Sequence, residues 1–191
     1  VDINQPSGDG TTPLLMAAIN GQFDLAMKLI EKGANPNMIS DAGASPLFAV
    51  LERKWAPKAS YAHPIEHQQQ QATHLDVIAT LLEAGADPNI RMNQHLWYTE
   101  YTFFVMSSGG IHYSGATPFW RATQALDLDA MRLSKEYGAK PDIPNIKRPK
   151  RRRPMDQTAD PEESVKEEVD HSGLPPVPNG GPFLYPIHLA A

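Results

Sequence analysis

Residues 9–37 read DGTTPLLMAAINGQFDLAMKLIEKGANPN, and this stretch decides the fold. The hydroxyl of Thr12 can accept a bond from an unpaired backbone N–H, and Pro13 loses no bond at a first helical position, so a helix is predicted to begin there. Gly21 ends that helix, and Gly33 lies where a left-handed C-cap is expected for a second one. The apolar face of the second helix is Phe23, Leu25, Ala26, Leu29 and Ile30.

A helix pair of this size is not stable alone, because helix nucleation is costly and each helix has a bare apolar side. It must therefore stack on copies of itself, and the chain contains such copies. The helix-opening motif at Pro13 recurs at Ser45-Pro46-Leu47, Thr117-Pro118-Phe119 and Tyr185-Pro186-Ile187. The closing motif at residues 33–37 recurs at 85–89 and 138–142, and Pro13 and Pro46 are 33 positions apart.

A period of 33 with Thr-Pro-Leu and Gly-Ala-Asn/Asp-Pro-Asn motifs resembles the ankyrin repeat. The resemblance covers residues 1 to about 145 and resumes at Tyr185. It implies an all-α solenoid of stacked helix-turn-helix pairs with β-hairpin-like fingers, in which fingers and first helices line a concave surface. The sequence departs from the family where Leu126 replaces the glycine between the third pair of helices. Its long insertions resemble those of bacterial ankyrin proteins.

The motifs divide the chain into one array, which we expect to be a fragment of a longer one. The expected units are a tail of a preceding repeat at 1–8, repeats at 9–40, 41–92 and 93–145, and the start of a fourth repeat at 181–191.

Three insertions interrupt this array. The first, 55–73, lies between the two helices of the second repeat, and its glutamine run predicts that the helix at His74 extends back toward Ile65. In the second, 93–114, β-branched and aromatic residues surround a Gly-Gly turn, which predicts an enlarged hairpin finger. The third, 146–180, is rich in charge and proline with few large apolar residues, so we expect a disordered or poorly ordered loop.

Composition excludes several classes of function. The chain has no cysteine, so disulfides and thiolate metal sites are ruled out, and no apolar run is long enough to span a bilayer. The basic run 147–153 suggests phosphate binding, but the acidic run 156–170 balances it within the same loop. Since the net charge of −5 then belongs to the repeats, binding to nucleic acid is not expected.

No catalytic, cofactor or metal residues are predicted. The strongest candidates are His63, His67 and His74, but they lack the tight clustering of metal ligands and are interpreted as solvent-facing residues on an extended helix. The chain carries no glycine-rich phosphate loop, nucleophile elbow or paired-carboxylate motif, which argues against an enzyme.

The resemblance implies a monomeric module for protein–protein interaction, because such arrays mostly bind other proteins. A structural spacer in a larger protein is the alternative, and a metal-dependent enzyme is a more distant one. The aromatic residues of the second insertion either form a local core or offer a patch to a partner, and strand alternation predicts both. The family's variable surface positions, with three of these aromatics, give the predicted contacts Ile39, Asp41, Ala42, Ala44, Glu52, Arg53, Trp97, Tyr98, Tyr101, Tyr113, Ser114, Ala116 and Gln124.

Overall fold

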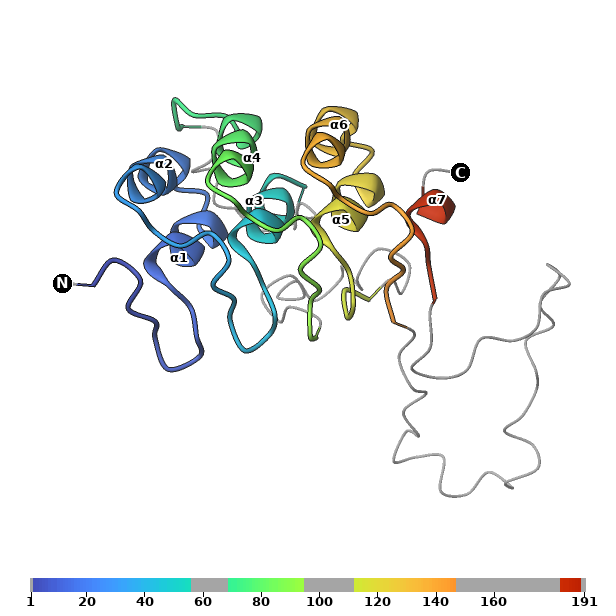
Figure 1. Ribbon diagram of the computed structural model, residues 1–191, viewed down its shortest axis with the longest axis horizontal. Coiled ribbons are helices and arrows are strands. Elements are labelled where there is room, and N and C mark those ends of the chain that lie inside the picture. Colours follow the sequence, from blue (N-terminus) through green and yellow to red (C-terminus); the bar gives the residue numbers. More distant parts are fainter. Residues whose placement is uncertain (1, 56–68, 95–111, 147–182, 190–191) are drawn as a thin grey trace, which may run out of the picture.

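The computed structural model describes residues 2–55, 69–94, 112–146 and 183–189. These residues form an all-α array in which short helices stack side by side in two layers (Figure 1). Parallel helices contact one another within each layer, α1 to α3 to α5 to α7 and α2 to α4 to α6. The helices are α1 (Pro13–Ile19), α2 (Phe23–Glu31), α3 (Pro46–Trp55), α4 (His74–Glu83), α5 (Pro118–Gln124), α6 (Leu128–Glu136) and α7 (Pro186–Leu189). The predicted solenoid of helix pairs is confirmed.

Hydroxyl caps start three helices of the inner layer, α1, α3 and α5, and α7 completes that layer. The Oγ1 of Thr12 accepts from the backbone N–H of Leu15 at 3.2 Å, and the Oγ1 of Thr117 accepts from that of Trp120 at 3.1 Å. Each cap is followed by a proline at the first helical position, where the missing N–H costs nothing. The repeated Thr-Pro motif therefore sets the same helix start in successive repeats.

Helix α4 begins later than predicted. Thr73 and Asp76 form a capping box: Thr73 Oγ1 accepts from the Asp76 N–H at 3.2 Å, and Asp76 Oδ2 accepts from the Thr73 N–H at 2.7 Å. The expected extension of this helix toward Ile65 is therefore wrong over residues 69–73, because the capping box fixes the first residue of the helix at His74. The remainder of that insertion, 56–68, lies outside the described residues.

Buried apolar side chains of successive repeats form one continuous core along the array. Three large apolar side chains follow the helix-opening Pro-Leu or Pro-Phe pair, and all three are fully buried: Leu15, Phe48 and Trp120. The ring of Tyr113 packs edge-on against Phe48 at 5.7 Å and against Trp120 at 6.1 Å, so these aromatics join the second repeat to the third.

One backbone bond closes each of the four fingers that lead into the inner helices. The bonds are Ser7 N–H to Thr11 O (2.9 Å), Ser40 N–H to Ala44 O (3.1 Å), Met92 N–H to Ala116 O (2.9 Å) and Asn145 N–H to Leu184 O (3.0 Å). In each finger the accepting carbonyl lies two residues before the proline that opens the inner helix. This holds although long insertions separate the two bonded residues in the third and fourth fingers. The described parts of the fingers hold one isolated bridge, at Ile146, and no strand, so their hairpin form is not confirmed. Residues 95–111 and 147–182, with the expected enlarged hairpin and charged loop, lie outside the described part of the chain.

Neighbouring fingers are linked by a second repeated bond. These bonds are Asp41 N–H to Asp9 O (2.9 Å), Asn93 N–H to Ala42 O (2.8 Å) and Ile146 N–H to Ser114 O (2.8 Å). Because each finger is tied to the next by its backbone, the row of fingers has a fixed spacing along the array.

An asparagine ladder links the repeats near the ends of the outer helices. The Oδ1 atom of Asn37 accepts from the Asp87 N–H at 2.7 Å, and its Nδ2 donates to the Gly85 carbonyl at 2.8 Å. Asn89 makes the equivalent pair of bonds one repeat further on, and the Oδ1 of Asn4 accepts from the Asn35 N–H at 2.8 Å. Each asparagine thus connects its own repeat to the one that follows.

Candidate functional site

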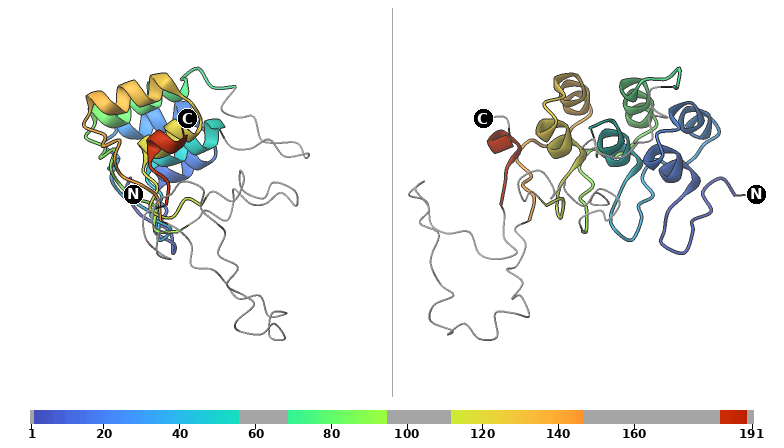
Figure 2. Two further views of the ribbon diagram at one scale, coloured as in Figure 1. Left: turned by 90° about the vertical axis from the view of Figure 1, so that its right-hand side faces the viewer. Right: turned by 180° about the vertical axis from the view of Figure 1, so that it is seen from behind.

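The fingers and the inner helices meet at a marked angle, so that together they border a concave surface (Figure 2). Six of the predicted contact residues are at least partly exposed to solvent. Ile39 and Asp41 are exposed on the second finger, and four others are half-buried: Ala42, Arg53, Ser114 and Gln124. These six residues are the candidate site.

Four of the predicted contact residues are buried, which corrects the sequence analysis. Ala44 and Ala116 accept the bonds that close their fingers, and their small side chains are packed inside the array. Glu52 and Tyr113 are buried between the second and third repeats. These four side chains therefore lie away from the solvent-facing part of the concave surface and are not part of the candidate site. The other three predicted contacts, Trp97, Tyr98 and Tyr101, lie outside the described residues.

Glu52 is instead half of a buried ion pair. Its carboxylate accepts from Nε of Arg121, and both side chains are almost fully buried. Arg121 also donates to the Trp55 carbonyl at 2.8 Å, and its guanidinium lies 5.8 Å from the centre of the Tyr113 ring. Burial, and then the negative charge of Glu52, raises the pKa of the Tyr113 hydroxyl well above its usual value. This group of charges joins α3 to α5 and is buried inside the array.

A second polar cluster lies where α5 turns into α6. Asp127 caps α6 by accepting from the Ala130 N–H at 3.1 Å, and its Oδ2 also meets Trp55 Nε1 at 2.8 Å and His74 Nε2 at 2.9 Å. Burial opposes ionisation of Asp127, but the bonds from Ala130, Trp55 and His74 outweigh it and lower the pKa of the carboxyl group. The interpretation of His74 as a solvent-facing residue is wrong, because Asp127 holds it between repeats.

Sequence reasoning missed both clusters. A signal existed for the first: Arg121 stands at a position of an inner helix where the first two repeats have the apolar residues Met16 and Ala49. Within the described residues, no group of three or more His, Cys, Asp and Glu side chains could hold a metal ion. In the same residues, no helix has the length and apolar character needed to cross a membrane.

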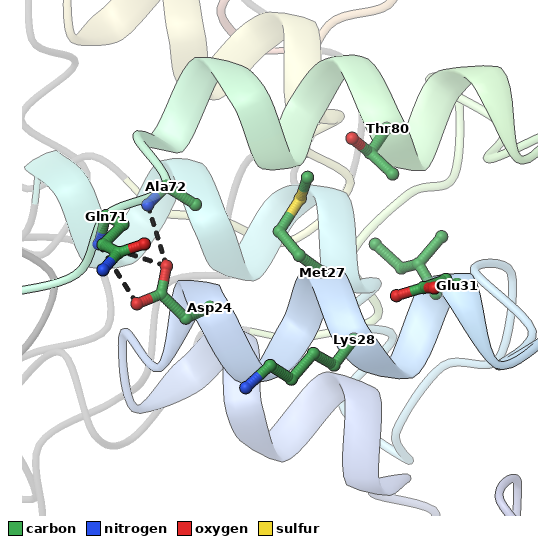
Figure 3. A pocket seen from close by; sticks show the side chains of 8 residues that line it. Asp24, Met27, Lys28, Glu31, Gln71, Ala72 and Thr80 are labelled. Carbon is green, nitrogen blue, oxygen red and sulfur yellow. Dashed lines mark hydrogen bonds between the residues drawn. The ribbon is translucent and has the colours of Figure 1, made fainter.

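An open groove of about 690 Å³ lies on the outer layer, between α2 and α4 (Figure 3). At one end, Asp24 accepts from the backbone N–H groups of Ala72 at 2.8 Å and Gln71 at 3.1 Å, and these bonds lower its pKa. Met27 lies in the middle of the groove and the other labelled side chains are around it. Asp24 therefore holds the chain in place just before α4 begins, so its role at this end of the groove is structural.

Stacked helix pairs, linked fingers and a concave face define a helical repeat protein. The chain contains an ankyrin repeat: the family model described as Ankyrin repeat matches residues 9–41. The repeat is a protein-interaction module, and its family is typically non-enzymatic. Palmitoyltransferase Hip14 of Drosophila melanogaster is 33% identical over 91 residues, which are 47% of this chain and 11% of that protein. The chain thus matches about a tenth of this relative's length. The resemblance to bacterial ankyrin proteins stays a prediction.

Proposed function

We propose that this chain binds a protein partner through its concave surface, with contacts from Ile39, Asp41, Ala42, Arg53, Ser114 and Gln124. The observation that carries the proposal is the series of backbone bonds between neighbouring fingers. Because these bonds hold the fingers at a fixed spacing before a partner arrives, little conformational entropy is lost on binding.

The exposed chemistry of the second finger suggests how contact is made. Ile39 offers an apolar side chain, and Asp41 presents a carboxylate two residues away. Arg53 lies on the adjoining helix α3, so the surface carries charges of both signs around an apolar contact. Such a mixed surface fits a folded protein or peptide rather than a nucleic acid, whose phosphates would meet a chain with a net charge of −5. We propose that the module acts as a monomer.

A photo-crosslinking experiment tests this function. The chain is made with benzoylphenylalanine in place of Ile39 and incubated with an extract of its native host. The matched control carries the same group in place of Leu25, an exposed leucine of similar size on α2 in the outer layer. We expect a discrete crosslinked product at position 39 that is absent at position 25 and is weakened by Asp41→Arg.

Circular dichroism must show unchanged helicity in each variant. Equal products at positions 39 and 25 would contradict the proposed surface. The absence of a product at both positions would favour a structural spacer instead.

A further inference from the structure

Three exposed apolar side chains lie where α3 ends and where α5 turns into α6, at the opposite ends of the inner helices from the fingers. Trp55, at the end of α3, is 41% exposed, and Leu126 and Leu128, either side of the α5–α6 turn, are 63% and 57% exposed. Asp127 lies between the two leucines in sequence and bonds the Trp55 indole N–H at 2.8 Å. That bond holds the tryptophan beside the turn, and the three residues are called the turn patch below.

The backbone of Leu126 is an independent sign that the patch is used. Its φ of +56° is in the left-handed region, where a side chain clashes with the backbone. The first repeat has Gly21 at the same position, with a φ of +70°, and glycine adopts this conformation without strain. Leucine here combines backbone strain with an exposed apolar side chain. A residue that is unfavourable for the free chain in both respects points to a contact made in a complex.

The charge around the patch decides what kind of partner fits. The ammonium group of Lys54 lies 5.5 Å from the centre of the Trp55 ring, and no carboxylate among the described residues pairs with it. The carboxylate of Asp127 is already bound by Trp55, His74 and the Ala130 backbone. Asp129, next to Leu128, is paired with Arg132 at 3.1 Å, so among the described residues Lys54 is the charge at the patch that lacks an opposite charge beside it.

We propose that the turn patch, with Lys54 at its rim, binds a peptide segment of another protein in which apolar side chains stand next to carboxylates. The apolar side chains cover Leu126, Leu128 and Trp55, and a carboxylate meets Lys54. The turn patch shares no residue with the candidate site on the concave surface, whose nearest members in sequence are Arg53 and Gln124.

Selection from a library of random dodecapeptides displayed on phage tests the proposal. The library is first depleted on the full chain carrying Leu126→Gly and is then selected on the unmodified chain. We expect enriched peptides to combine two or more large apolar residues with Asp or Glu. A synthetic copy of the strongest peptide should bind about tenfold more weakly to Leu126→Gly and to Leu128→Ser, and more weakly to Lys54→Glu.

The matched control is Leu25→Ser, which removes an exposed leucine on α2, outside the patch, and should leave the affinity unchanged. Enrichment of basic peptides, no enrichment, or equal affinity for Leu126→Gly would overturn the proposal. Two further measurements identify other occupants. A dimer in sedimentation velocity that Leu126→Gly abolishes would assign the patch to a second copy, and binding to phosphatidylserine vesicles that the same change abolishes would assign it to a membrane surface. Either result would overturn the peptide assignment.

Discussion

At the scale of the residue, the backbone of Leu126 carries the clearest local strain in the described chain. A non-glycine residue in the left-handed region costs about 1–2 kcal/mol. Glycine removes this strain, but it also increases the conformational entropy of the unfolded chain. That entropy offsets roughly half of the stabilisation gained by removing the strain. We therefore predict that Leu126→Gly raises the free energy of unfolding by about 0.5–1 kcal/mol, as measured by urea denaturation.

The reverse change provides a control, since Gly21→Leu places the strain in the first repeat and should lower the free energy of unfolding. A fall in stability for Leu126→Gly would show instead that the leucine side chain packs against the folded chain.

The contribution of the Asp127 carboxyl group to the free energy of unfolding depends on pH. Its pKa is lowered on folding, so its contribution is present above the unfolded value of about 3.9 and is lost as the pH falls through the folded value. We predict that the stability difference between the unmodified chain and Asp127→Asn is largest near neutral pH and shrinks as the pH falls below about 4. Urea midpoints from pH 7 to pH 3 measure this difference, and a constant difference would contradict the assignment.

At the scale of the element, the Glu52–Arg121 pair decides how α3 and α5 pack. Both side chains are more than nine-tenths buried, so removing one leaves an uncompensated charge inside the array. We predict that Arg121→Met alone, or Glu52→Leu alone, lowers the free energy of unfolding by about 3–5 kcal/mol. The double variant should lose far less than the sum of the two, because both charges leave together.

A double-mutant cycle by chemical denaturation measures this coupling. Additive losses would mean that each side chain is held by other contacts and that the ion pair itself contributes little.

At the scale of the whole molecule, the array is held by contacts between neighbouring repeats. Its stability is therefore close to a sum of repeat terms and interface terms, and damage at one interface should have a local effect. Asn37 makes two hydrogen bonds to the next repeat. We predict that Asn37→Ala weakens that interface by about 1 kcal/mol and speeds amide exchange in α1 and α2 more than in α5 and α6.

Asn89→Ala is the matched variant at the next interface along the array. It should accelerate amide hydrogen exchange in α5 and α6 more than Asn37→Ala does. Uniform acceleration across all helices in both variants would show one cooperative unit instead of coupled repeats.

Much of the architecture follows from local sequence signals. Thr12-Pro13 and Thr117-Pro118 start helices through bonds that span three residues, and Gly33 ends one through its own left-handed φ of +86°. Short-range signals of this kind need no knowledge of distant residues. Repeated at fixed spacing, they determine the helix pairs, their order and the places where the fingers begin. By itself the sequence therefore determined the solenoid and the approximate line of its concave surface.

Only the tertiary structure decided which predicted contacts are available to a partner. Glu52 is withdrawn from the surface by Arg121, a residue 69 positions away, and Trp55 is held by Asp127, 72 positions away. The capping box at Thr73, and the bonds that Asp24 accepts from the N–H groups of Gln71 and Ala72, likewise prevailed over the helix propensity of the glutamine run. Periodicity shows which side of a helix faces inward, but it does not show which charged side chain finds a partner there. That depends on which repeats lie next to each other, and stacking brings those residues together.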